Sequence, residues 1–190
     1  MNFMAWGDES GSHAVRDPDV YLMAAAISEA KYIDQLRGPM EALRLPSSGP
    51  KLHWRAESSQ RRAQIVDVIA SLPLDGFVVV RRGSKFDRSE RQRKKCLEHL
   101  MVSLAELGCG EIVLESRGRA DDQRDADVVD HLRRRRMLSS DIHLSHQRGP
   151  AEPALWIADA LCGAVSQDRL GEPRYLKTIA SRVTVEVLEA

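Results

Sequence analysis

Two adjacent carboxylates near the start of the chain are the first residues able to do chemistry. The segment Asp8-Glu9-Ser10-Gly11 directly follows an apolar run, residues 3–6, that predicts a first β-strand. Negative charge at the end of a strand is unfavourable in free energy unless a cation neutralises it. The segment is therefore a candidate catalytic or metal-binding site. Asp, Ser and Gly also form turns, so a polar strand end followed by a turn explains the same residues.

Two further carboxylates stand in comparable surroundings. Glu115 ends a second strand-like run, residues 111–115, as the acidic pair follows the first. Asp159 lies in the middle of residues 152–167, whose apolar composition predicts a buried helix. An unpaired buried aspartate is unstable, so Asp159 requires an arginine, a set of hydrogen-bond donors or a metal ion. A buried salt bridge or a hydrogen bond to the backbone is the alternative to a metal.

These three carboxylates can converge. If the strands that end near Asp8 and at Glu115 are parallel neighbours, their side chains meet at one edge of the sheet, and Asp159 approaches from a helix packed on it. A divalent cation is the simplest neutraliser. Carboxylate oxygens suit Mg²⁺ or Mn²⁺, and the absence of clustered His and Cys argues against zinc. Two such ions about 4 Å apart could activate a water and stabilise the leaving oxygen in phosphodiester cleavage.

The elements that must position these residues alternate between strand and helix after an opening antiparallel hairpin. This order favours an α/β fold, a mixed sheet with helices packed on it. Apolar runs and alternation predict strands at residues 3–6, 21–27, 76–80, 111–115 and 142–146, with an edge strand at 183–187. Helical periodicity predicts helices at residues 31–45, 58–72, 96–107, 116–136 and 152–167. Loops are expected at residues 12–19 and 46–50.

Composition bounds the class of protein. The 190 residues, 43% of them hydrophobic, fit one domain spanning residues 1–190. Lys plus Arg and Asp plus Glu number 28 each, so the net charge points to no partner. Cys96, Cys109 and Cys162 form no Cys-x-x-Cys pair, which argues against disulfides and predicts reduced thiols in a cytoplasmic protein. No basic leader and no apolar run of about 20 residues is present, so we expect no signal peptide and no membrane partner.

Basic residues cluster in one part of the chain. Residues 81–95 hold eight basic and two acidic side chains, a local net charge of +6. This cluster could bind the phosphates of a nucleic acid, or form a solvated helix face with neighbouring ion pairs. Residues 133–136 are four arginines that spread around a helix and cannot all face one ligand. His143 and His146 fall on opposite faces of a predicted strand and make a poor ligand pair.

Three motifs taken together resemble a known family. They are Asp8-Glu9-Ser10-Gly11, Lys51-Leu52-His53-Trp54 and Leu155-Trp156-Ile157-Ala158-Asp159-Ala160-Leu161. In this combination the chain resembles the domain-of-unknown-function family numbered 3800, over about residues 3–168. The resemblance implies a ribonuclease H-like fold for the domain, with an acidic site for Mg²⁺ or Mn²⁺.

The resemblance also implies roles for individual residues. Asp8, Glu115 and Asp159 would be the metal ligands. Glu9 would be a further ligand, or would support the ligands without binding the metal itself. Lys51 would contact a scissile phosphate or orient a water.

His53, in the same basic motif, would share that role, although a surface histidine beside a tryptophan is the simpler interpretation. Trp156 stands where members of the family often carry glutamine, so contacts one turn before Asp159 would differ.

The leading functional hypothesis is a metal-dependent nuclease, or a related phosphodiester hydrolase, that binds nucleic acid. Whether the nucleic acid is DNA, RNA or a hybrid stays open, as does the oligomeric state. A catalytically inactive ribonuclease H-like binding or regulatory module is the alternative. A third hypothesis, in which Asp8 and Glu115 act as a general acid–base pair on a non-nucleotide substrate, as in glycoside hydrolysis, ranks last.

Overall fold

The computed structural model describes residues 3–11, 15–84 and 86–189. Within these ranges, one mixed sheet has the strand order β5-β4-β1-β2-β3-β6. Its strands are β1 (Phe3–Gly11), β2 (Val20–Glu29), β3 (Asp75–Arg82), β4 (Cys109–Glu115), β5 (His143–Gln147) and β6 (Val183–Leu188). The loop expected at residues 12–19 is described only from Val15 onward, and Lys85 of the basic cluster also lies outside the described residues.

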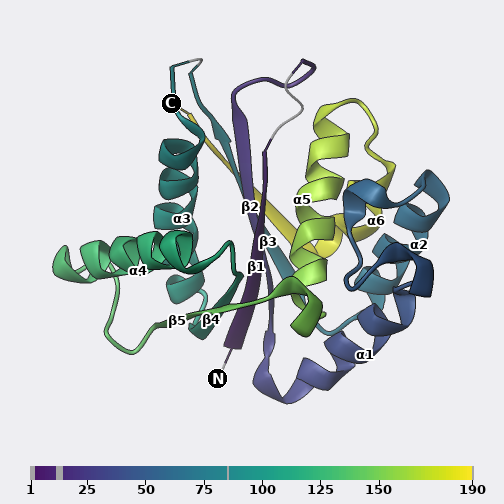
Figure 1. Ribbon diagram of the computed structural model, residues 1–190, viewed down its shortest axis with the longest axis horizontal. Coiled ribbons are helices and arrows are strands. Elements are labelled where there is room, and N and C mark those ends of the chain that lie inside the picture. The colour runs from purple at the N-terminus through teal and green to yellow at the C-terminus, as the bar shows by residue number, and fades with distance from the viewer. Residues whose placement is uncertain (1–2, 12–14, 85, 190) are drawn as a thin grey trace.

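Helices pack on both faces of the sheet (Figure 1). They are α1 (Ile33–Leu43), α2 (Ser59–Ser71), α3 (Ser89–Glu106), α4 (Arg119–Arg134), α5 (Leu155–Arg169) and α6 (Arg174–Ile179). Figure 1 shows α3 and α4 on one side of the sheet and α1, α2, α5 and α6 on the other. None of the described helices is both long enough and apolar enough to cross a bilayer.

The strand directions confirm the predicted mixed α/β sheet. β1 and β2 form the opening antiparallel hairpin, paired from Phe3 with Glu29 to Gly11 with Tyr21. β3 continues the antiparallel pairing next to β2. β4 is parallel to β1 and to β5, and β6 is parallel to β3 at the opposite edge. The two acid-bearing strands β1 and β4 are therefore parallel neighbours.

β1 is longer than the sequence predicts. It does not stop before Asp8 but continues to Gly11, because β2 pairs with it along its whole length. The parallel pairing with β4 ends earlier, at Gly7 with Leu114. Asp8 therefore lies inside β1, one residue beyond its last pair with β4, next to Glu115 at the end of that strand.

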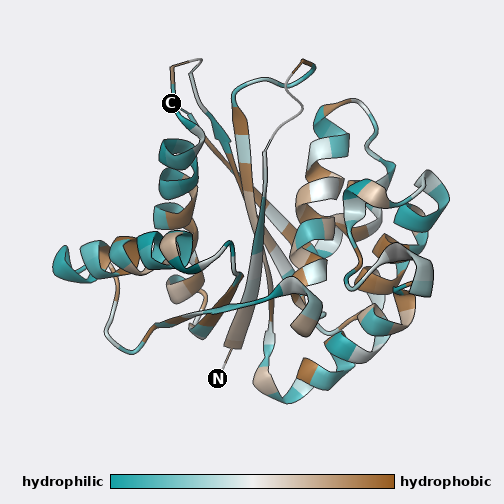
Figure 2. Cartoon of the chain, in the orientation of Figure 1, coloured by the Kyte–Doolittle hydropathy of each residue, from teal (hydrophilic) through white to brown (hydrophobic). Residues whose placement is uncertain are grey.

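Side-chain alternation along the strands divides the core into two clusters, one on each face. Trp6 of β1 packs in the cluster that contains α5, whereas Ala5 packs in the cluster that contains α3 and α4. Because successive residues of a strand point to opposite faces, Asp8 shares the face of Trp6 and Glu9 shares that of Ala5. Figure 2 shows apolar colour along the strands and on α5, and a mostly hydrophilic α4.

One of the two helices around the site matches expectation, and the other begins earlier than predicted. α5 is buried along Leu155–Val165, as its composition predicts. α3 begins at Ser89, seven residues earlier than predicted, so four basic residues, Arg91, Arg93, Lys94 and Lys95, lie in its first turns. The many charged side chains of that segment obscure the apolar periodicity from which a helix is predicted.

Candidate active site

Asp8 is partly buried and lies near two other carboxylates. Burial raises its pKa, and the facing carboxylates of Glu115 and Asp159 raise it further, to about 8. Two groups act in the opposite direction, the Glu9 backbone N–H, which donates to Asp8 Oδ1 over 2.7 Å, and the nearby Lys51 ammonium. The structure thus brings together the three carboxylates that the sequence singled out, on one face of the sheet.

Asp159 enters this site from α5 and is only 7% exposed. Its Oδ2 accepts the backbone N–H of Trp54 over 2.9 Å and lies 2.8 Å from Nδ1 of His53. The hydrogen bond to Asp159 raises the pKa of His53, which favours the imidazolium form. The alternative expected for Asp159, a hydrogen bond to the backbone, is therefore present, and it leaves Oδ1 of the carboxylate for a further partner.

Glu115 is held by a cation of the chain. Nζ of Lys51 lies 2.6 Å from Oε1 and 2.9 Å from Oε2 of Glu115. Burial acts to lower the pKa of Lys51, but the hydrogen bonds and charge of Glu115 outweigh it and raise that pKa. Gly149 makes room for the pair, since a Cβ there would lie 2.4 Å from Glu115 Oε1 and 2.9 Å from Lys51 Cδ.

Lys51 and His53 belong to the basic segment, which we define as residues 51–55. It is not a strand, yet its side chains alternate: Leu52 and Trp54 are buried, while Lys51 and His53 reach the carboxylates. Trp54 fixes the segment on α5. Its indole lies over Gly163, where a Cβ would come within 2.2 Å of the ring.

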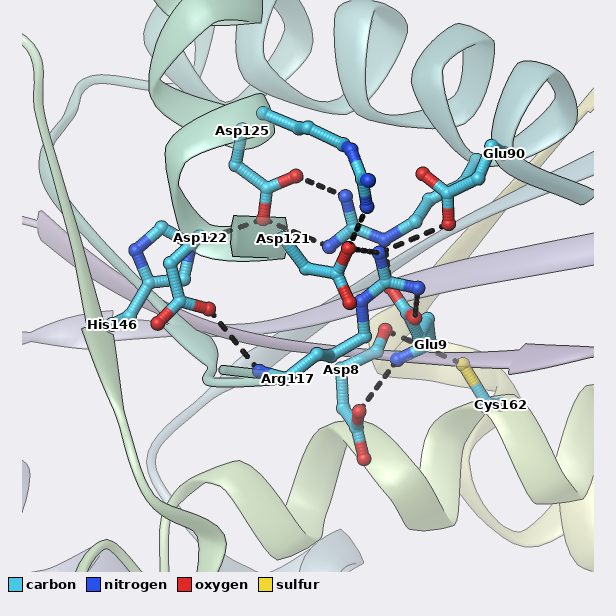
Figure 3. Close-up of polar contacts among 11 residues, drawn as sticks. Asp8, Glu9, Glu90, Arg117, Asp121, Asp122, Asp125, His146 and Cys162 are labelled. Carbon is cyan, nitrogen blue, oxygen red and sulfur yellow. Dashed lines mark hydrogen bonds and ion pairs between the residues drawn. The ribbon is translucent and has the colours of Figure 1, made fainter. Parts of the chain in front are cut away.

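Glu9 does not join the other three carboxylates. Its Oε2 lies 2.5 Å from Nε of Arg93 and its Oε1 lies 3.0 Å from Nη1 of Arg117, both on the α3 and α4 side. Figure 3 shows the Asp8 carboxylate pointing toward the helix that carries Cys162, whereas Glu9 points to the side where Arg117 and Asp125 lie. Strand alternation separates the two neighbours, so we leave Glu9 out of the ligand set and keep it as a group behind Asp8.

A buried polar network lies behind the site, and the sequence does not predict it. Arg93 and Asp125, 3% and 1% exposed, form a bidentate ion pair, and His146 Nε2 lies 3.0 Å from Asp125 Oδ2. Burial acts to raise the pKa of Asp125, but hydrogen bonds from His146 and Arg93 lower it overall. A signal was present, because Asp125 shares a helical face with Val128 and Leu132, at spacings of three and seven.

Most described members of the basic cluster at residues 81–95 have acidic partners within the chain. Arg81 and Arg91 both pair with Asp87, at 3.0 and 3.5 Å, and Lys95 pairs with Glu98 at 2.7 Å. Arg81 packs beside Cys96 on the α3 side of the sheet, the face opposite to that of Asp159. Intramolecular ion pairing, the alternative interpretation, therefore accounts for most of this cluster.

The donor set fits a hard divalent cation. Among residues 3–11, 15–84 and 86–189, no three His, Cys, Asp or Glu side chains stand, as they lie, in position to ligate one metal ion. The reason is local, since Lys51 holds Glu115 and the basic segment holds Oδ2 of Asp159. Asp8 is partly buried and faces the negative charges of Glu115 and Asp159, which together raise its pKa, and Mg²⁺ or Mn²⁺ would neutralise these charges through oxygen ligands.

Comparison with known sequences gives no match, either to a family model or to a curated protein. Solved structures do match. A chain of the PCNA:RNase HII complex from Archaeoglobus fulgidus superposes with a TM-score of 0.57 at 13% identity, covering 92% of this chain and 76% of that one. This likeness shows that the fold is ribonuclease H-like, as expected.

Two further structures match with lower TM-scores. The ribonuclease H2 of Pyrococcus horikoshii gives 0.40 at 15% identity, over 95% of this chain and 76% of that chain. A mutant of Bst-RNase HIII gives 0.48 at 11% identity, over 94% of this chain and 53% of that chain.

Proposed function

We propose that this protein is a metal-dependent nuclease in which Asp8, Glu115 and Asp159 hold Mg²⁺ or Mn²⁺. The observation that supports it most is the convergence of these carboxylates from β1, β4 and α5, where burial first and then the charges of Glu115 and Asp159 raise the pKa of Asp8 to about 8. Carboxylates that share one site in this way are typical of divalent-cation centres. A bound divalent ion would supply charge stabilisation at the reacting phosphate and a lower pKa for an attacking water.

The fold, the sequence motifs and the basic residues of the site support nucleic acid as the proposed substrate class. The fold is shared with a chain of a ribonuclease HII complex, and the three sequence motifs resemble the domain-of-unknown-function family numbered 3800. The site also carries its own phosphate-binding groups. Lys51 is a protonated donor beside Glu115, and His53, whose side chain is 49% exposed, holds Asp159 through Nδ1, which leaves Nε2 for the substrate.

These two basic residues have distinct roles in the proposal. Lys51, which now holds Glu115, would be free to contact an oxygen of the scissile phosphate if that carboxylate held a cation. His53 stays on Asp159, which fixes the tautomer, and its Nε2 donates a proton to the leaving oxygen. The raised pKa of Asp8 favours its protonated form when no cation is bound, so binding of a cation by Asp8 would be coupled to the loss of a proton.

A second candidate is a catalytically inactive ribonuclease H-like binding module. The pairing of Lys51 with both oxygens of Glu115 favours it, because an internal cation then neutralises a carboxylate that a nuclease needs free. In such a module the acids serve the fold and bind no metal.

Cleavage of labelled single-stranded DNA, duplex DNA, RNA and RNA–DNA hybrid, with Mg²⁺, Mn²⁺ or a chelator, separates the two candidates. The nuclease proposal predicts metal-dependent cutting that is lost in Asp8→Asn and Asp159→Asn. Glu111→Gln is the matched control, because Glu111 is an exposed acid on the same strand as Glu115. Cutting that persists in both site variants contradicts the proposal, and no cutting together with no metal binding favours the inactive module.

A further inference from the structure

The basic segment extends beyond the site itself. Lys51 contacts Glu115 and His53 contacts Asp159, and the next alternate residue, Arg55, reaches the end of β1. Nη2 of Arg55 donates to Ser10 Oγ over 3.0 Å and to the Gly11 carbonyl oxygen over 2.8 Å. Three basic side chains thus form a row that starts at the carboxylates and ends past them.

The backbone under this row is held from several sides. Trp54 meets the ring of Tyr175 edge to face at 5.3 Å and lies over Gly163 of α5. Arg62 of α2 donates from Nε to the Trp54 carbonyl over 3.1 Å and from Nη2 to the Arg55 carbonyl over 3.3 Å. A ligand that binds the row therefore meets a surface whose backbone is already ordered, which lowers the entropic cost of binding.

The row retains free hydrogen-bond donors. Within the part of the chain that the structure describes, Arg55 uses only Nη2, so its Nε and Nη1 are available. Toward the described residues His53 uses only Nδ1, and its side chain is 49% exposed. An arginine with open donors on an exposed, fixed backbone suits phosphate, which accepts paired hydrogen bonds from the guanidinium.

We infer that the basic segment binds one strand of nucleic acid through successive phosphates, and that Arg55 holds a phosphate next to the one that is cut. This inference rests on the proposed function. Arg55 contacts residues two and three positions beyond Asp8, about 7–10 Å farther along β1, which puts its phosphate outside the reaction site. Arg55 is thus a binding and positioning residue and takes no part in the reaction.

Among the described residues, the tryptophans near this surface offer no platform for bases. Trp6, Trp54 and Trp156 surround the site, but their exposed fractions are 0%, 2% and 1%. Bases stack on exposed aromatic rings, and none of these three can offer one. Recognition by the basic segment is therefore directed to the backbone, with weak dependence on base sequence and strong dependence on salt.

Binding can be measured apart from cleavage. The probe is a fluorescein-labelled oligonucleotide of mixed sequence, as a single strand and as a duplex, titrated in Mn²⁺ with Asp8→Asn protein between about 50 and 200 mM salt. Arg55→Gln and Arg55→Lys are added to this parent. The matched control is Arg135→Gln, an exposed arginine that follows α4.

Arg55→Gln is expected to weaken binding roughly three- to tenfold and to reduce the slope of log K against log salt by about 0.7 for the single strand, or about 0.9 for the duplex. Arg55→Lys keeps the slope because it keeps the charge, and Arg135→Gln keeps both quantities. A purely structural role for Arg55 would weaken binding without changing the slope. An unchanged slope in Arg55→Gln, or an equal loss in Arg135→Gln, overturns the inference.

Failure of this inference is distinguishable from failure of the proposed function. If wild-type protein cuts the probe and Arg55→Gln binds with the parental slope, only the inference is wrong. If wild-type protein neither cuts nor binds any nucleic acid, the proposed function fails and the inference fails with it. Thermal unfolding of Arg55→Gln checks that the exposed substitution leaves the fold intact.

Discussion

Nζ of Lys51 lies 2.6 and 2.9 Å from the two carboxylate oxygens of Glu115, on the face of the sheet that also carries Asp8 and Asp159. The pair is half-buried, so water screens it less than it would a surface ion pair. A cation of the chain therefore competes with any metal ion for this carboxylate. The strength of metal binding should depend on Lys51 even though a lysine is not a ligand.

Replacing Lys51 with methionine should tighten metal binding. The variant removes both the competing hydrogen bonds and a positive charge near the site, so we expect Mn²⁺ affinity to rise by about tenfold or more. Calorimetric titration measures it. Lys95→Met is the control, because Lys95 pairs with Glu98 on α3 and should leave the affinity unchanged. Weaker binding in Lys51→Met would show that Lys51 supports the site instead of competing for it.

The raised pKa of Asp8 predicts a pH-dependent stability. An aspartate whose pKa rises from 3.8 to about 8 on folding stabilises the protein most below pH 4, and this stabilisation is lost as the pH climbs to about 8. Asp8→Asn lacks the ionisation. In a chelator at pH 9 it should therefore be more stable than wild type by at least about 1 kcal/mol, or roughly 2–4 °C in Tm.

Thermal unfolding at pH 4 and pH 9 tests this. The difference between Asp8→Asn and wild type should grow with pH, whereas Glu111→Gln should show no such growth. A difference that stays constant across the range would mean that Asp8 is already ionised at neutral pH.

Gly163 should be essential for the placement of the basic segment. A Cβ at this position would lie 2.2 Å from the Trp54 indole, so Gly163→Ala must displace the ring. We expect a loss of about 1–3 kcal/mol in the free energy of unfolding, together with weaker oligonucleotide binding, because Trp54 anchors His53 and Arg55. The control is Gly38→Ala in α1, where nothing lies within 4 Å of a Cβ and alanine should be neutral or stabilising.

The network behind the site should contribute to stability. Arg93→Met leaves the buried Asp125 carboxylate without its bidentate partner, which should cost about 3–5 kcal/mol in urea unfolding. Arg91→Met is the matched control. Arg91 is on the exposed side of α3 and pairs with Asp87, which precedes the helix, and its loss should change stability by less than about 0.5 kcal/mol. A similar small loss in both variants would contradict this role of the buried pair.

Some of this site can be read from the sequence and some cannot. Apolar runs place Asp8 and Glu115 near strand ends and Asp159 in a buried helix, since hydrophobic periodicity is local information. The parallel pairing that brings β1 beside β4 depends on topology. The separation of Glu9 from Asp8 follows from strand alternation, but only once β1 is known to continue through Gly11, which its pairing with β2 decides.

The ion pair of Arg93 and Asp125 could not be predicted from the sequence either. Helical spacing marks Asp125 as inward-facing, yet the partner that neutralises it lies 32 residues earlier on α3. A run of basic side chains around Arg93 favoured a solvated surface or a phosphate site. Which charged residue is buried depends on its tertiary partner, and a single sequence carries no record of that partner.

The central claim is that Asp8, Glu115 and Asp159 form one metal site from which Glu9 is excluded. Calorimetric titration with Mn²⁺ tests this claim most directly. Wild-type protein should bind Mn²⁺, and Asp8→Asn, Glu115→Gln and Asp159→Asn should each weaken binding by about tenfold or more, while Glu9→Gln and Glu111→Gln retain it. No binding by folded wild-type protein, or a loss in Glu9→Gln as large as that in Asp8→Asn, would contradict the account.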